Sequence, residues 1–210
     1  FVKTNKQKIM KKTVLSLISI AALSTVLISS CKKKDKEEDI TEPEVNQVCD
    51  GNGSASYYPL AVGNSRVYAF TFGTVVDITM AVIDTKVIGG KTYFAQVTSG
   101  FIGTDTSYYR EDPTTHDVYE IDGTETLMVP GNPVVGQVLP SDAGTTSKVT
   151  NLNASYSTAT CSYTGLLEVT DYDASTSKVV NTAYYKKGLG LVGAFDDNGF
   201  DLKLKAATLK

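Results

Sequence analysis

The stretch Val76-Asp77-Ile78-Thr79-Met80-Ala81-Val82 decides the fold, because apolar residues take every second position along it. Residues 200–205, Phe-Asp-Leu-Lys-Leu-Lys, repeat the same alternation near the end of the chain. Successive side chains of a β-strand point to opposite faces, so a period of two indicates a strand with one buried face. No helical stripe of any length interrupts this pattern after Ser65. We therefore expect residues 65–210 to form β-strands.

Turn signals separate the expected strands at strand-length intervals. Dipeptides that contain glycine supply the positive φ that tight hairpins need. Four of them lie between the expected strands: Gly63-Asn64, Gly89-Gly90, Asp122-Gly123 and Asn198-Gly199. Pro130, Pro133 and Pro140 predict an irregular crossing between two halves, because proline cannot donate to a central ladder. The spacing predicts an all-β antiparallel meander of about nine to eleven strands. A curved half-open sheet, a barrel-like domain and a sandwich all remain open.

One short echo hints at an internal repeat. Val62-Gly63-Asn64 comes before the first expected strand, and Val135-Gly136-Gln137 comes after the proline-rich crossing. Each could begin one half of the domain.

The N-terminal part predicts export and a lipid anchor. Lys11 and Lys12 precede an uncharged, mostly apolar run over residues 14–30, which ends in small residues directly before Cys31. This arrangement resembles a bacterial lipoprotein signal, in which Cys31 becomes the lipidated first residue of the mature protein. The run is short for a transmembrane helix, which needs about 20 apolar residues. Met10 is the better start, so residues 1–9 are expected to lie upstream of it.

Three regions follow from this interpretation: residues 1–30 (upstream residues and signal peptide), residues 31–49 (lipidated Cys31 and a flexible charged tether) and residues 50–210 (one all-β domain). The tether has charge runs and few apolar residues, so it cannot bury a core. Lys32, not Asp, follows Cys31, which favours the outer membrane, on its periplasmic or surface side. Residues 36–39, Lys-Glu-Glu-Asp, resemble the signal that sends lipoproteins of Bacteroidetes-type bacteria to the cell surface. A plain solvated tether explains them equally well.

Charge and cysteine content narrow the partners. Residues 50–210 hold 11 Lys and Arg against 17 Asp and Glu, a net charge of −6, without a basic patch. Nucleic-acid binding is therefore disfavoured. With Cys31 lipidated, Cys49 and Cys161 remain as an even pair that an oxidising compartment permits to form a disulfide. Two unpaired thiols are the alternative.

Several segments resemble an uncharacterised family of bacterial, Bacteroidetes-like lipoproteins and secreted β-proteins. Residues 57–68, Tyr-Tyr-Pro-Leu-Ala-Val-Gly-Asn-Ser-Arg-Val-Tyr, are similar to the family's opening, and residues 184–192, Tyr-Tyr-Lys-Lys-Gly-Leu-Gly-Leu-Val, to its closing segment. Residues 133–139 resemble its internal Val-Gly segment. The family usually has Trp at the place of Arg66, so the packing anchor of the first strand is in doubt. The resemblance implies an antiparallel β-rich domain with a curved or half-open sheet, and it implies no established enzymatic role.

No spacing of residues indicates catalysis or a metal site. His116 is the only histidine, in a segment that predicts a turn, and neither a nucleophile motif nor a Cys-x-x-Cys pattern accompanies it. Residues 171–177 place oxygen-bearing side chains at alternate positions, but the Gly and Glu of a calcium loop are missing. We therefore expect no cofactor and no metal, with His116 as the one candidate base.

Tyrosine is the enriched aromatic type, with 12 residues. Tyr68, Phe70 and Phe72 form a stripe on one face of an expected strand, where they could contact a ligand or fill the core. Paired tyrosines such as Tyr108-Tyr109 and Tyr184-Tyr185 should put one ring inside the sheet and one outside.

Three functional hypotheses follow. A non-catalytic binding or interaction module for an apolar, glycan or protein ligand ranks first, a purely structural envelope component second, and an enzyme that uses His116 last.

The first prediction concerns the anchor. The Cys31→Ala variant has no thiol to receive acyl chains such as palmitate, so it should remain unprocessed or become soluble. Membrane fractionation of cells that express each form measures this. A variant that sediments with membranes as the parent does would contradict the lipoprotein interpretation.

Overall fold

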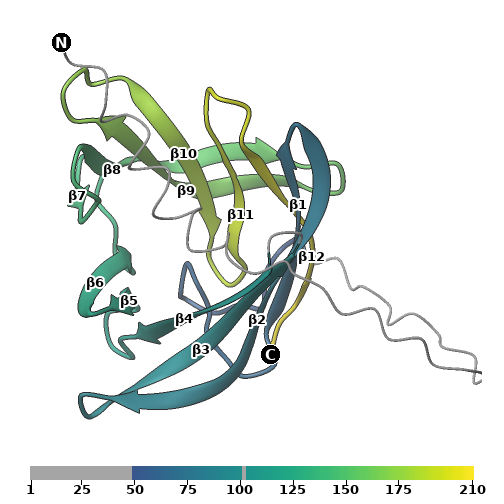
Figure 1. The fold of residues 1–210 in the computed structure, drawn as a ribbon, viewed down its shortest axis with the longest axis vertical. Coiled ribbons are helices and arrows are strands. Elements are labelled where there is room, and N and C mark those ends of the chain that lie inside the picture. Colours follow the sequence, from purple (N-terminus) through teal and green to yellow (C-terminus); the bar gives the residue numbers. More distant parts are fainter. Residues whose placement is uncertain (1–48, 101–102) are drawn as a thin grey trace, which may run out of the picture. The chain divides into compact units, whose positions relative to one another are not determined.

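The computed structural model describes residues 49–100 and 103–210, except for the side chain of Phe72. All secondary structure in this part is β-strand (Figure 1). The strands are β1 (Ser65–Phe72), β2 (Thr74–Ile88), β3 (Lys91–Gly100), β4 (Gly103–Glu111), β5 (Val118–Asp122), β6 (Thr124–Val129), β7 (Val138–Leu139), β8 (Thr145–Ser157), β9 (Ser162–Asp173), β10 (Val179–Lys186), β11 (Gly190–Phe195) and β12 (Asp201–Thr208). Within these residues, no helix has the length and hydropathy that a membrane crossing requires.

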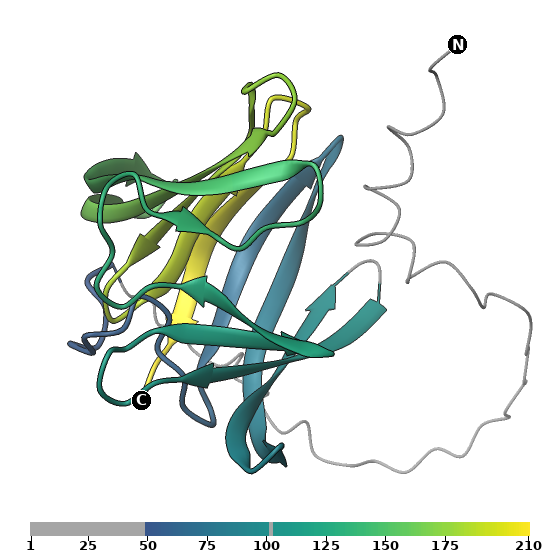
Figure 2. The ribbon, with the colours of Figure 1, turned by 90° about the vertical axis from the view of Figure 1, so that its left-hand side faces the viewer.

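The strands form one antiparallel sheet in the order β6-β5-β4-β3-β2-β1-β12-β11-β10-β9-β8-β7. The predicted all-β antiparallel meander is confirmed, and among its three forms the barrel-like one is observed, because the sheet curls into a nearly closed barrel shape (Figure 2). Pairing of β1 with β12 joins the two halves of the sheet at its centre. Its two edges are β6 and β7, which residues 130–137 connect. Strand β7 is absent from the predicted set because two residues are too few to show alternation.

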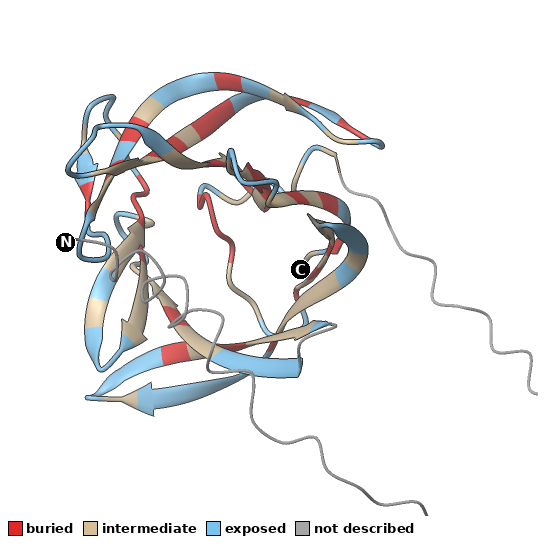
Figure 3. Cartoon of the chain, turned by 45° about the horizontal axis from the view of Figure 1, so that its top comes forward, coloured by how far each residue is buried: buried red, intermediate tan, exposed pale blue. Residues whose placement is uncertain are grey.

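The alternation predicted for β2 and β12 corresponds to real burial. In β12, Leu202 and Leu204 are buried whereas Lys205 is exposed, and in β2, Val82 is buried whereas Asp77 is exposed. Figure 3 shows buried and exposed residues alternating along the strands. One buried cluster centres on β1, β11, β12 and the β8–β9 hairpin, and a second on the strands nearest the two edges.

The loop before β1 has a specific hydrogen-bonded geometry. The Gly63 amide donates to the Val82 carbonyl, the Asn64 amide to the Ala61 carbonyl, and the Val82 amide to the Asn64 carbonyl. Gly63 has a φ of 96°, which a residue with a Cβ rarely adopts. This geometry joins the start of β1 to the buried end of the β1–β2 ladder.

The same geometry occurs before β7. The Gly136 amide donates to the Val149 carbonyl, the Gln137 amide to Val134, and the Val149 amide to Gln137, with φ at Gly136 of 87°. The short sequence echo therefore marks two structurally equivalent positions. We therefore divide the sheet into two halves, β1–β6 and β7–β12, in which β1 corresponds to β7.

Arg66, the residue that left the packing anchor of the first strand in doubt, is fully buried on β1. Its Nε donates to the Leu189 carbonyl at 2.7 Å and its Nη2 to the Pro59 carbonyl at 3.1 Å. The guanidinium also lies over the Tyr58 ring, 5.0 Å from the centroid. Arg66 is therefore a charged anchor that holds two other segments against β1.

A disulfide joins Cys49 to Cys161, with Cα atoms 5.6 Å apart. Cys161 is buried at the β8–β9 turn, and Cys49 packs against the first hydrophobic cluster. The bridge connects the beginning of the described chain to a hairpin 112 residues later.

The second prediction concerns Arg66. In the Arg66→Met variant the carbonyls of Pro59 and Leu189 stay buried without their donors, so unfolding free energy should fall by about 2–4 kcal/mol. Urea denaturation of both forms measures the change. Lys86→Met, on an exposed residue, is the control and should shift stability by less than about 0.5 kcal/mol. Equal midpoints for Arg66→Met and the parent would show that Arg66 does not anchor the fold.

The third prediction concerns the disulfide. Because the bridge closes a loop of 112 residues, the Cys161→Ser variant should lose up to about 4–5 kcal/mol in the chain-entropy estimate. Protein purified from the cell envelope and denatured without reductant should show no reactive thiol from Cys49 or Cys161. Two titratable thiols would exclude the bridge.

Candidate functional site

The residues singled out by sequence lie in different environments. Cys31 lies outside the described residues. Tyr68 is fully buried and its hydroxyl donates to the Leu191 carbonyl at 3.0 Å. Phe70 is half-buried, with its ring 5.4 Å from that of Phe200, and the Phe72 side chain lies outside the described part. Tyr68 therefore fills the core.

His116 lies in the β4–β5 turn with a φ of 62°. Its Nδ1 is 2.8 Å from a carboxylate oxygen of Glu111. The turn is shaped by Asp112, whose side chain accepts the amides of Thr114 and Thr115. Within the described chain, the His116 ring makes this one side-chain hydrogen bond, and no Ser, Thr or Cys side chain is bonded to it. The arrangement explains a stable turn without any catalytic role.

The oxygen-rich segment at residues 171–177 divides between a strand and a turn. Asp173 closes the β9–β10 turn, where Oδ1 accepts from the backbone and hydroxyl groups of Ser175 and Thr176. These hydrogen bonds lower the pKa of Asp173 to about 2. Among the described residues, no three His, Cys, Asp or Glu side chains lie close enough to hold a metal ion.

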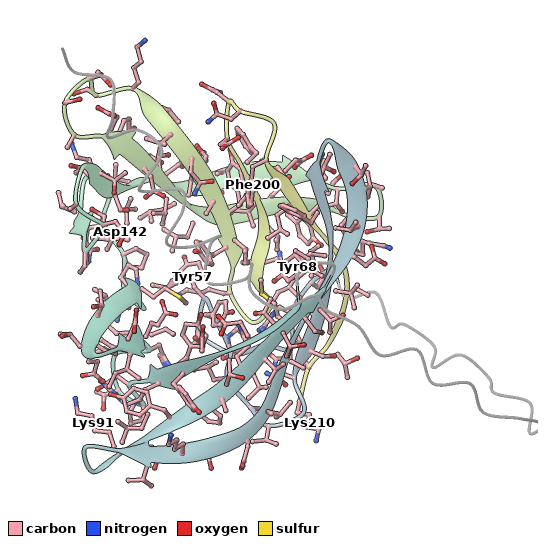
Figure 4. All side chains as sticks on the ribbon, viewed as in Figure 1. Tyr57, Tyr68, Lys91, Asp142, Phe200 and Lys210 are labelled. Carbon is pink, nitrogen blue, oxygen red and sulfur yellow. A yellow bond between two sulfur atoms is a disulfide. The ribbon has the colours of Figure 1, made fainter. Side chains whose placement is uncertain are left out.

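A different set of side chains converges inside the sheet. The pairing register puts Arg66, Val82, Gln96, Tyr109 and Glu120 on one face of β1–β5, which we call the inner face. Pairing from β1 through β12, β11 and β10 to β9 places Tyr185 and Asp171 on the inner face as well. Six residues on or against this face form what we call the interior cluster: Tyr58, Gln96, Tyr109, Glu120, Asp171 and Tyr185. Figure 4 shows Tyr57, the neighbour of Tyr58, within the space that the strands enclose.

Tyr58 is central to the interior cluster. Its hydroxyl donates to Gln96 Oε1 at 2.8 Å, and its ring lies 5.6 Å from the Tyr109 ring at an angle of 51°. Burial raises the pKa of the Tyr58 hydroxyl, and the charge of Arg66 partly offsets this effect. Tyr58 therefore links the Arg66 anchor to the side chains of β3 and β4.

Tyr185 joins the two sides of the interior. Burial raises the pKa of its hydroxyl, and Tyr58, Asp171 and Glu120 raise it further. Glu120 belongs to β5 and Asp171 to β9, strands that are far apart in the sheet order. Tyr185 packs against the buried cluster that holds Tyr109, the partner of Glu120, and Val169, two residues before Asp171, so the curl of the sheet brings the two walls together around Tyr185.

The cluster keeps hydrogen-bonding capacity that the described chain does not use. The Tyr185 hydroxyl and the Gln96 amide nitrogen bond to no described residue, and neither atom is sealed from solvent as the Nη1 of Arg66 is. Glu120, Asp171 and Tyr185 are half-buried. Unused donors and acceptors at the end of rigid strands can bind a polar ligand, whereas no pairing of acid, base and nucleophile is present among them.

Sequence reasoning missed Gln96 and Glu120, and it considered Asp171 only as part of the oxygen-rich segment 171–177. A polar residue on a strand gives no sign of which face it occupies until the register is known. Sequence reasoning did single out the tyrosine pairs. Tyr109 is buried and Tyr108 half-buried, and the register puts Tyr185 on the inner face and Tyr184 on the opposite one. The pairs were thus the available signal for this site.

Comparison with known proteins does not identify a family. No family model matches the chain, and no curated protein matches it significantly. Among solved structures, the chain is similar to a protein of Bacteroides fragilis described as exported and as having a YmcC-like fold, with a TM-score of 0.46 and 7% identity over 73% of this chain and 99% of that one. It is also similar to a protein of Parabacteroides distasonis described as a lipoprotein, with a TM-score of 0.39 and 8% identity over 75% of this chain and 100% of that one.

Proposed function

We propose that this protein is a lipoprotein anchored to the outer membrane through Cys31, and that its β-domain is a non-catalytic binding module for a glycan. One observation carries the binding proposal: hydrogen-bonding side chains from opposite walls of the sheet converge in the interior cluster and keep unused capacity. The anchor proposal is supported by the Lys-flanked apolar run that ends at Cys31.

A glycan suits the interior cluster better than an apolar ligand does. Sugars present many hydroxyl groups and apolar ring faces, which tyrosine rings, amides and carboxylates recognise together. Glu120 and Asp171 would each cost free energy if an apolar ligand removed them from water without replacing their hydrogen bonds. A polyhydroxylated ligand supplies those bonds, so the half-buried carboxylates favour it.

A purely structural envelope component is the second candidate. It is favoured by Tyr68, which is fully buried, and by the two hydrophobic clusters, which occupy much of the interior. An enzyme that uses His116 ranks last: Glu111 holds the ring, but no Ser, Thr or Cys side chain among the described residues is bonded to it.

The fourth prediction separates the first two candidates. Tyr185→Phe removes a hydroxyl that no described residue uses, so the unfolding free energy should stay the same or rise slightly. Glycan affinity should fall by roughly threefold to tenfold, the value of one neutral hydrogen bond. A glycan array identifies the ligand, and calorimetric titration of the full chain in detergent measures the affinity.

Tyr172→Phe is the matched control, because the register puts Tyr172 on the opposite face. It should leave the affinity unchanged. Absence of glycan binding by the parent protein would favour the structural role, and equal effects of both substitutions would exclude the interior cluster as the site.

A further inference from the structure

The two faces of the sheet carry different charges. Arg110 follows the inner-face Tyr109, and Lys148 precedes the inner-face Val149, so both lie on the opposite face. The same register reasoning puts four further strand cations on the opposite face: Lys86, Lys91, Lys186 and Lys203. The exceptions are Arg66 and Lys205, which lies at the β12 bulge. Within the described strands, Arg66 is thus the one cation that the register places on the inner face.

Three carboxylates on the opposite face, Glu125, Asp77 and Asp201, pair with lysine or arginine. Glu125 lies 2.5 Å from Lys91 Nζ and 2.8 Å from Arg110 Nε. Hydrogen bonds from Arg110, Lys91 and Tyr93 lower its pKa to about 2. Asp77 pairs with Lys205 at 2.7 Å, and Asp201 with Lys203. These three carboxylates therefore have little attraction left for a ligand.

The carboxylates of the interior cluster lack such partners. Among the described residues, no Lys or Arg forms an ion pair with Glu120 or Asp171. Asp171 accepts hydrogen bonds from Ser147 Oγ and, at 3.2 Å, from Asn181 Nδ2, both neutral groups. Arg66 forms no ion pair with either carboxylate, because its guanidinium donates to two backbone carbonyls. Its charge still acts on Tyr58 within the cluster.

A second, independent feature points to a ligand at the same place. Gln96 is only 2% exposed, yet its amide nitrogen donates to no described residue, while its oxygen accepts from Tyr58. The nitrogen still reaches solvent, so it can give to a ligand the hydrogen bond that it otherwise gives to water. The register puts Gln96 next to Ser107, one residue pair from Tyr109 and Glu120.

We infer that the interior cluster selects a ligand that carries an ammonium group, an amino sugar, over its neutral and anionic counterparts. This inference rests on the proposed glycan-binding function and names its substrate class. The Glu120 carboxylate receives the ammonium group, and the Gln96 amide donates to a neighbouring hydroxyl. Replacing a neutral hydrogen bond by a charged one strengthens binding by about fivefold or more. An anionic sugar is repelled by both carboxylates.

Three tetrasaccharides of equal length test the inference: the glucosamine, N-acetylglucosamine and galacturonic acid tetramers, which are cationic, neutral and anionic. Each is titrated calorimetrically into the full chain in detergent, at low and at physiological salt. We expect the glucosamine tetramer to bind at least about fivefold more tightly than the N-acetylglucosamine tetramer, and the galacturonate tetramer most weakly. Glu120→Gln should remove the preference for glucosamine.

Glu168→Gln is the control, because Glu168 pairs with Tyr184 on the opposite face. It should leave the preference intact at physiological salt. Equal affinities, or tightest binding of galacturonate, would overturn the charge selection while supporting glycan binding. A preference that survives Glu120→Gln would mean general attraction to an acidic protein, which also overturns it. Failure of all three to bind would contradict the glycan proposal itself.

Discussion

Burial of the Arg66 guanidinium is the constraint on which the interior depends. A buried charged group costs free energy unless its N–H groups form hydrogen bonds. No carboxylate among the described residues pairs with the buried Arg66 guanidinium. The donors instead go to the carbonyls of Pro59 and Leu189, and the Tyr58 ring covers the charge. These bonds can form only if the segment before β1 and the β10–β11 turn both pass next to β1. The position of Tyr58, and through it that of Gln96, follows from this one requirement.

The two halves of the sheet are joined by hydrogen bonds at β1 and β12 but not at β6 and β7, and the sequence of each half explains this difference. Strand β1 pairs with β2 along all of Ser65–Phe72, and with β12 on its other side. Its counterpart β7 pairs with β8 only at Val138 and Leu139, because Pro140 follows and cannot donate to the ladder. The ladder that would join β7 to β6 does not form, and these strands remain the edges. An unpaired edge invites aggregation, and the charged side chains of Glu125 and Lys91 beside β6 reduce that risk.

Local rules predicted much of this fold. Alternation identified β2 and β12, and the Gly-containing turns identified the hairpins, because both signals depend on neighbouring residues alone. The choice of a barrel-like sheet over a sandwich depended on the β1–β12 pairing, which joins residues more than 100 positions apart. Arg66 could not be recognised as a buried anchor, since its partners are backbone carbonyls that leave no trace in the sequence. The interior cluster was hidden for the same reason: Glu120 and Asp171 meet only after the sheet curls.

The internal repeat also explains how an ordinary core can become a recognition site. Tyr109 pairs with Phe94 and Tyr185 with Leu167, at equivalent places in β4 and β10, so the repeat puts two tyrosines on opposite walls. The symmetry ends at their next neighbours, because Glu120 stands beside Tyr109 whereas Leu191 stands beside Tyr185. A strictly symmetric interior would offer two equal walls and no preferred orientation for a ligand. The difference between Glu120 and Leu191 makes the two walls unequal, and a sugar ring, with polar edges and an apolar face, is itself unequal in the same sense.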